Sequence, residues 1–174
     1  MERICNSTRV QNYRPPTKGK VITILKNIAE HIRYGSKHAT EIVNAAYRTG
    51  WPGEGLCLGW VKNVFNNAGL KGTYCFGQSS ANACYRGLKN TGTPIHTDRN
   101  IPTGAVVFGT GAGEAGYKWG HIGICVQGED SGKTIKIRDS INSGLQTVTL
   151  NEWIGQQQFA PHYKGYVLYE EIVK

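Results

Sequence analysis

Residues 53–69 read GEGLCLGWVKNVFNNAG, a stretch that places a cysteine at the start of a helix. Cys57 follows a Gly-Glu-Gly turn, and apolar residues then recur at three- and four-residue intervals until Gly69, a residue type that commonly ends helices. The members of this apolar stripe are Cys57, Val61, Val64, Phe65 and Ala68. The pattern predicts an amphipathic helix with Cys57 in its first turn. What this thiol does depends on whether another part of the chain supplies it with a base.

Helical periodicity dominates the first half of the chain and short β-branched runs dominate the second half. Apolar spacing predicts helices over residues 21–35, 36–49, 57–69 and 79–90. Strands are predicted at residues 105–109, 120–127, 134–141, 145–150 and 165–173, with a brief helical turn over 150–159. Helices followed by strands indicate an α+β fold with an antiparallel sheet.

The composition favours one globular domain. The 174 residues include 23 glycines and only 18% charged residues, which argues against disorder and against a coiled coil. No apolar run reaches the roughly 20 residues that cross a bilayer, so we expect no membrane span. Residues 1–20 lack the apolar core of a signal peptide. We interpret residues 1–20 as a basic N-terminal arm and residues 21–174 as a single domain.

The net charge of +8 favours an anionic partner such as a phosphate-rich polymer. The basic residues are scattered, however, so nucleic acid is not expected to be the partner. The five cysteines include no Cys-x-x-Cys pair, which argues against structural zinc. Cys75 and Cys84 fit a disulfide and two buried thiols equally well.

Cys57 has a chemical use beyond packing. The partial positive charge and unpaired N–H groups of a helix N-terminus favour a thiolate, and the Cys57 N–H is free to donate to an oxyanion. The alternative is an inert core cysteine, which is common.

A candidate base lies in GHIGICVQ, residues 120–127. With a period of two, His121, Gly123 and Cys125 share one face of this strand. The opposite face is apolar and is expected to lie in the core; its residues are Ile122, Ile124 and Val126. We therefore expect His121 to point into a cleft or to solvent, where it could serve as the base for a thiol.

A candidate third group lies in TIKIRDSINSG, residues 134–144. Ile135, Ile137 and Asp139 share a parity, and a strand paired beside the His121 strand would bring the Asp139 carboxylate to the imidazole. Asn142 could do the same by hydrogen bonding. Asp139 could equally cap the turn that follows it.

These segments resemble the CHAP family, the cysteine, histidine-dependent amidohydrolases/peptidases, which are close to NlpC-type peptidoglycan hydrolases. The similarity covers roughly residues 36–170 and rests on three motifs in order. A Cys-x-x-Trp-Val element is matched by Cys57, Trp60 and Val61. A Pro-x-Gly-Ala-hydrophobic run is matched by Pro102, Gly104, Ala105 and Val106. A Gly-His-hydrophobic-Gly-Ile strand is matched by Gly120, His121, Ile122, Gly123 and Ile124.

The resemblance implies a papain-like fold, with the nucleophile helix packed on an antiparallel sheet, so that residues 21–174 form a CHAP-like catalytic domain. It implies an endolysin-like enzyme that cleaves an amide bond of peptidoglycan, as an N-acetylmuramoyl-L-alanine amidase or an endopeptidase. Cys57 would be the nucleophile, His121 the base, and Asp139 the third member. Four aromatic residues near these positions are candidates to line a substrate groove: Trp51, Trp60, Tyr117 and Trp119. Trp60 could equally be core.

No cofactor is expected. Some family members bind calcium in an acidic loop before the nucleophile, but residues 35–56 hold only Glu41 and Glu54, too few for six to eight oxygen ligands. The expected partners are bacterial peptidoglycan and anionic wall polymers, with wall targeting supplied by the charge, the arm or a separate subunit. We expect action on the bacterial wall after release from a host cell or by export that needs no signal peptide. The alternatives are a thiol protease or deamidase-type effector that acts on a protein, and a non-catalytic basic module that binds wall or nucleic acid.

Overall fold

The computed structural model describes residues 17–19, 35–71, 74–110, 118–156 and 162–173. The chain divides into two units, Met1–Arg33 and Tyr34–Lys174. Only residues 17–19 of the first unit are described, so the helix predicted over residues 21–35 lies outside the described residues except for its last position. All that follows concerns the second unit.

The second unit is an α+β fold, as the sequence predicts. Its α-helices in the described residues are α2 (Ala39–Arg48), α3 (Cys57–Asn67), α4 (Ala81–Asn90), α6 (Leu150–Gly155) and α7 (Tyr169–Ile172), with 3₁₀ turns η1 (Tyr74–Gly77) and η2 (Glu129–Ser131). Local sequence explains several of their starts. The Ser80 hydroxyl accepts a hydrogen bond from the Ala83 N–H at the start of α4. Thr149 and Glu152 form a capping box that begins α6.

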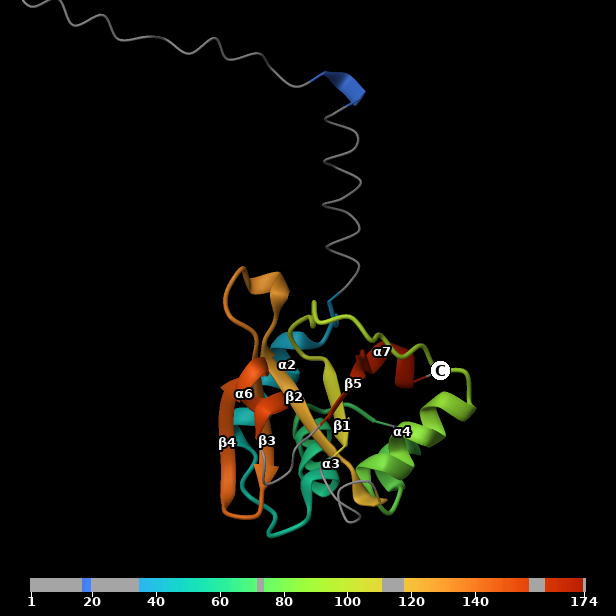
Figure 1. Ribbon diagram of the computed structural model, residues 1–174, viewed down its shortest axis with the longest axis vertical. Coiled ribbons are helices and arrows are strands. Elements are labelled where there is room, and N and C mark those ends of the chain that lie inside the picture. The colour runs from blue at the N-terminus through green and yellow to red at the C-terminus, as the bar shows by residue number, and fades with distance from the viewer. Residues whose placement is uncertain (1–16, 20–34, 72–73, 111–117, 157–161, 174) are drawn as a thin grey trace, which may run out of the picture. The chain divides into compact units, whose positions relative to one another are not determined.

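Five strands form one antiparallel sheet in the order β4-β3-β2-β1-β5. Their bounds are β1 Val106–Thr110, β2 His121–Gln127, β3 Lys136–Ile141, β4 Gly144–Thr149 and β5 His162–Val167. Strands β1 to β4 form the antiparallel meander expected from their spacing, and β5 adds beside β1 (Figure 1).

The strand predicted over residues 165–173 is wrong at its C-terminal end. Strand β5 stops at Val167, and α7 begins two residues later. The Glu171 carboxylate accepts a hydrogen bond from the Leu168 N–H at 2.8 Å and so caps the first turn of α7. A side-chain cap of this kind satisfies a backbone donor that a strand would have paired with its neighbour.

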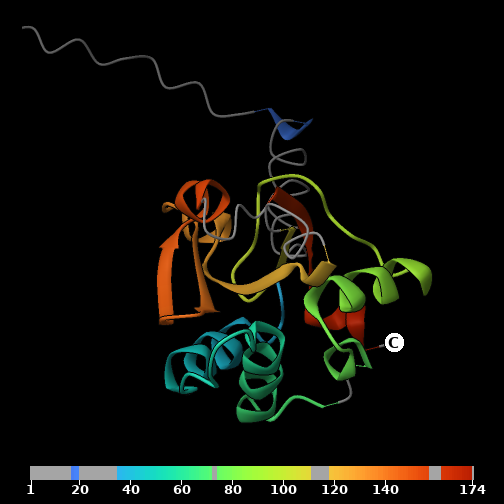
Figure 2. The ribbon, with the colours of Figure 1, turned by 60° about the horizontal axis from the view of Figure 1, so that its bottom comes forward.

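Both faces of the sheet are covered. Helices α2 and α3 lie together against one face, and α6 lies on the opposite side (Figure 2). The first face contributes Val106, Phe108, Ile122, Ile124, Val126 and Val167 to the core beneath α2 and α3. The second contributes Val107, Cys125, Ile137 and Tyr166 to a smaller core with Trp153 of α6. This double coverage explains why β1 and β2 are almost fully buried.

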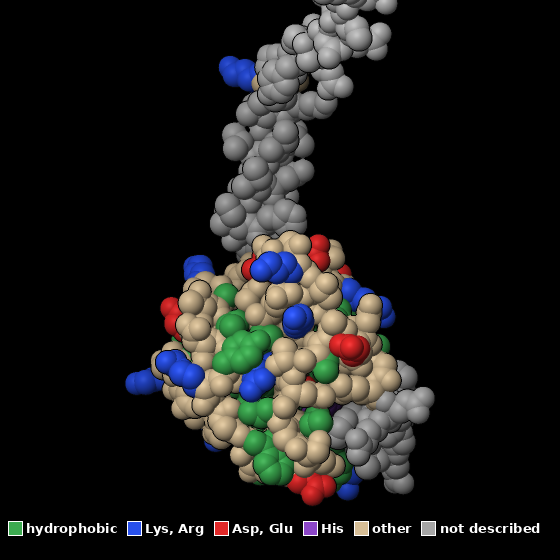
Figure 3. Space-filling model, turned by 90° about the vertical axis from the view of Figure 1, so that its left-hand side faces the viewer, with side chains coloured by type: hydrophobic (Ala, Val, Ile, Leu, Met, Phe, Trp, Pro, Cys, Tyr) green, Lys and Arg blue, Asp and Glu red, His purple; other side chains and the backbone are tan. Residues whose placement is uncertain are grey.

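Cys75 and Cys84 are free thiols in this structure, and both are buried. They are hydrogen bonded to each other, and burial together with the neighbouring Cys75 raises the pKa of the Cys84 thiol far above its ordinary value. Lys and Arg side chains are spread singly over the face shown in Figure 3, in agreement with their scatter in the sequence. No helix in the described residues combines the length and apolar character that a membrane crossing needs.

Gly104 fixes the approach of α2 to the loop before β1. Its φ of +84° lies in the left-handed region, and an added Cβ would lie 2.8 Å from the Ala39 Cα. Any side chain at this position would therefore meet both backbone strain and a backbone clash. This is a physical reason for glycine in the Pro-x-Gly run.

Replacing this glycine tests the packing. We expect Gly104→Ala to lower the free energy of unfolding by about 2–4 kcal/mol, because strain and overpacking add. The matched control is Gly92→Ala, since Gly92 has a φ of +72° but no atom within 4 Å of an added Cβ. Gly92→Ala should lower the free energy of unfolding by only about 1 kcal/mol, because it adds backbone strain but no clash. Urea unfolding followed by circular dichroism would compare them, and equal losses would contradict the proposed clash.

Candidate active site

Cys57 is the first residue of α3, as the sequence predicts, and it is partly exposed. The N-cap residue is Leu56, whose side chain makes no capping hydrogen bond, and the first turn contains no acidic residue. The N–H groups at this helix end are therefore not occupied by a side-chain cap. The sulfur sits at the positive end of the helix dipole, beside donors that suit a developing oxyanion.

His121 and Asp139 meet through the pairing of β2 with β3. Gly123 of β2 is the register partner of Asp139, so the residue two positions before Gly123 lies diagonally across from the carboxylate on the same face. The His121 Nε2 and Asp139 Oδ2 atoms are 2.6 Å apart. Both side chains are buried, with exposures of 5% and 0%. Asp139 lies within β3, is paired with the imidazole and does not serve as a turn cap.

Gly123 makes room for this pair. An added Cβ would lie 2.8 Å from the Ile137 Cγ2 atom and 3.2 Å from the Asp139 Cβ atom. A side chain at position 123 would therefore displace the β3 side chains that flank the carboxylate. Glycine is needed here for space, since its φ is not in the left-handed region.

His121 is hydrogen bonded to both Asp139 and Cys57, which joins the three predicted residues. Because Nε2 faces Asp139, Nδ1 is the ring nitrogen left to meet the thiol. Burial of the ring lowers its pKa, but the hydrogen bonds with Asp139 and Cys57 outweigh burial and raise the pKa of His121 to about 9. The imidazolium is therefore the favoured form at neutral pH.

Two residues that the sequence analysis missed surround the carboxylate. Trp153 of α6 donates its Nε1–H to Asp139 Oδ2 at 3.1 Å, and its ring stacks on the His121 ring with centroids 5.7 Å apart. The Gln146 side chain of β4 donates to the same oxygen at 3.3 Å and pairs with Gln156. The sequence signal for Trp153 was its place in a short helix with a Thr-x-x-Glu capping box.

Of the two orientations that the sequence allows for His121, toward a cleft or toward solvent, the structure excludes solvent. His121 is buried because α6 covers its face of the sheet and Trp153 lies over the ring. Cys57 is therefore the more exposed of the two groups.

The predicted groove residues have different locations. Trp51 and Trp119 are 46% and 50% exposed, beside Cys57 and His121 in the chain, and Trp51 donates to the Ile141 carbonyl at 2.9 Å. Trp60 is fully buried and points its Nε1–H at the Thr49 carbonyl, so it is corrected from a groove residue to a core residue. Tyr117 lies outside the described residues.

Asn142 does not take the third position. It is exposed in the turn between β3 and β4, whereas Asp139 is the residue that bonds the His121 ring. The described residues hold no group of three or more His, Cys, Asp or Glu side chains arranged to bind a metal ion. No protein-family model, curated protein or solved structure matches this chain.

The raised pKa of His121 predicts how stability depends on pH. Histidine in the unfolded chain titrates near 6.5, so the imidazolium contribution is complete below pH 6.5 and is lost as the pH rises through about 9. The loss should approach about 3 kcal/mol in the free energy of unfolding. Urea unfolding at pH 6.5 and 9.5 would measure it in the wild type and in His121→Gln. A loss of the same size in both proteins would contradict this origin.

The Trp153 contact makes a second prediction. Trp153→Phe retains an aromatic ring over His121 but removes the donor to the buried carboxylate, so the free energy of unfolding should fall by about 2 kcal/mol. The matched control is Trp51→Phe, which removes an exposed N–H donor to a carbonyl and should cost less than about 1 kcal/mol. Thermal or urea unfolding at pH 7 distinguishes them, and the reverse order would refute the role of Trp153.

Proposed function

We propose that this protein is a cysteine amidohydrolase/peptidase of the CHAP type, with a papain-like catalytic domain that cleaves an amide bond of peptidoglycan. The observation that carries the proposal is the bonding of one buried imidazole to both Cys57 and Asp139. A helix-borne thiol, a strand-borne base and an orienting carboxylate are the parts that nucleophilic amide cleavage requires.

Each of the three residues has a distinct role in this mechanism. Cys57, as a thiolate beside the His121 imidazolium, attacks the amide carbonyl, and its own N–H donates to the oxyanion. His121 then protonates the leaving amine and afterwards activates water to release the acyl group. Asp139 fixes the ring orientation and stabilises the imidazolium. The pKa of about 9 suits a residue that must hold its proton until the leaving group needs it.

The substrate class rests on the three motifs that resemble the family, and the chemistry rests on the geometry. The exposed Trp51 precedes Cys57 by six residues and the exposed Trp119 precedes His121 by two, and both can pack against sugar or peptide. The bond is the amide between sugar and stem peptide or a peptide bond of the stem or cross-bridge. We place the activity at the bacterial wall, after lysis of a host cell or export, and the net charge of +8 draws the chain to anionic wall polymers.

Digestion of purified peptidoglycan tests the proposal. Wild-type protein should release soluble fragments, and mass spectrometry of these fragments from several wall types identifies the bond. Cys57→Ala should lower the rate by on the order of 10⁴-fold or more while leaving the circular dichroism spectrum unchanged, because the nucleophile is lost and the side chain is small. The matched control is Cys84→Ala, which removes a buried thiol from α4 and should retain lytic activity.

Three other results would each contradict the proposal. Full activity in Cys57→Ala would exclude Cys57 as the nucleophile. No fragments from any wall, with Cys57 still alkylated rapidly by iodoacetamide, would indicate a thiol enzyme that acts on a protein. No fragments together with slow alkylation would indicate a binding module.

A further inference from the structure

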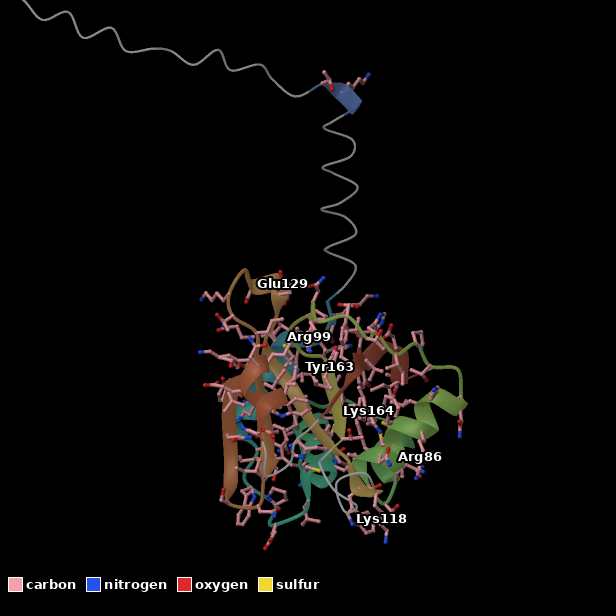
Figure 4. All side chains as sticks on the ribbon, in the orientation of Figure 1. Arg86, Arg99, Lys118, Glu129, Tyr163 and Lys164 are labelled. Atoms are coloured by element: carbon pink, nitrogen blue, oxygen red, sulfur yellow. The ribbon has the colours of Figure 1, made fainter. Side chains whose placement is uncertain are left out.

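A group of cations lies beside the first residues of the strand that carries His121. Lys164 of β5 donates to the Asn82 Oδ1 atom at 2.9 Å, and the Asn82 Nδ2 atom donates to the Lys118 carbonyl at 3.3 Å. Arg86 follows Asn82 by one turn of α4 and acts on the charge of Lys164. We call Lys118, Lys164, Arg86 and Asn82 the cationic cluster. Figure 4 labels its three charged members on the side of the domain where α4 lies.

The cluster is not neutralised within the part of the chain that the structure describes. Among the described residues, the ion pairs are those of His96 with Glu171 and of His121 with Asp139. Within that part of the chain, no carboxylate pairs with Lys118, Arg86 or Lys164. Lys164 is partly buried, and burial together with the charge of Arg86 lowers its pKa. Arg86 and the partly buried Lys164 repel each other, and a bound anion would offset this repulsion.

Aromatic side chains hold the lysines in place. The Lys164 ammonium lies 4.8 Å from the centre of the Tyr85 ring, and the Lys118 ammonium lies 4.7 Å from that of Trp119. Such cation–π contacts restrict flexible side chains that would otherwise move freely in solvent. The Lys164 ammonium is thus packed against α4, and the Lys118 ammonium against the neighbouring Trp119.

The cluster adjoins the candidate active site. An added Cβ on Gly120 would lie 3.0 Å from the backbone nitrogen of Asn82, so α4 begins in contact with the residue that precedes His121. Gly120 has a φ of +67°, which favours glycine, and a side chain there would crowd the Asn82 backbone. Asn82, which binds Lys164 and precedes Arg86 by one turn, is therefore next to Gly120, the residue before His121.

We propose that the cationic cluster is a subsite for a free carboxylate of the peptide substrate, held beside the amide that Cys57 attacks. This inference rests on the proposed function for its substrate, a wall stem peptide. Arg86 supplies a planar guanidinium that matches a carboxylate, and Lys164 and Lys118 supply further charge. The nearness to His121 favours a group on the substrate itself over a distant polyanion. The cluster would thus make the enzyme prefer stems with free carboxylates to amidated stems.

Binding measurements on the full chain test the subsite without relying on turnover. Calorimetry with Cys57→Ala as the acceptor uses the synthetic stem peptide L-Ala-D-isoGlu-L-Lys-D-Ala and the same peptide with its carboxylates amidated. The free-carboxylate peptide should bind more tightly, and Arg86→Gln in the same background should raise its Kd by about tenfold or more. Arg86 is exposed, so this substitution should not disturb folding. The amidated peptide should be unaffected.

The matched control is Lys133→Gln, which removes one exposed positive charge between η2 and β3 and should leave both Kd values unchanged. Equal binding of the two peptides, or no response to Arg86→Gln, would overturn the subsite. Binding of poly(glycerol phosphate) through Arg86 without carboxylate-dependent peptide binding would also overturn it and would assign the cluster to a wall polymer.

The binding experiment tests the subsite and the digestion experiment tests the hydrolase, so either proposal can be refuted without the other. Release of peptidoglycan fragments with no carboxylate preference would leave the hydrolase and remove the subsite. Carboxylate-dependent binding lost in Arg86→Gln, without any fragment release, would support the subsite and refute the hydrolase.

Discussion

The buried hydrogen bond between His121 and Asp139 is the constraint on which the site depends. A carboxylate and an imidazolium can be removed from water only if their charges and donors are paired. The register that sets Gly123 opposite Asp139 aligns them, and the missing side chain of Gly123 leaves the room. Trp153 and Gln146 add donors to the same carboxylate oxygen. The sheet and α6 are therefore both needed to keep this pair stable, and the thiol of α3 completes it.

The local spacing of apolar residues predicts much of this arrangement. The helical stripe after Cys57 predicts α3, and the two-residue period of GHIGICVQ and TIKIRDSI sets the parity of His121 and Asp139. The register between the strands is a tertiary property, since it depends on where the connection through η2 lets β3 begin. For that reason the sequence left Asp139 and Asn142 as alternatives, and the structure distinguishes them by placing Asn142 in the turn beyond the strand.

The features that sequence could not provide involve contacts between distant segments. The sequence does not distinguish a tryptophan that packs into the core, as Trp60 does, from one that stays half-exposed, as Trp51 does. The position of Trp153 over His121 depends on how α6 crosses the sheet, and the spacing of apolar residues does not predict that crossing. The end of β5 was missed for a different reason, because the apolar run from Gly165 continues through the start of α7.

The three candidate catalytic residues lie on α3, β2 and β3, and this dispersal has a consequence for the newly made chain. Helix α3 is local and can form early, whereas the pairing of β2 with β3 brings together residues 18 positions apart in sequence and follows from closure of the sheet. A chain that has its helix but not its sheet exposes a thiol with no imidazole beside it. Under the proposed mechanism, such a chain is inactive in the cell that synthesises it until the sheet has closed.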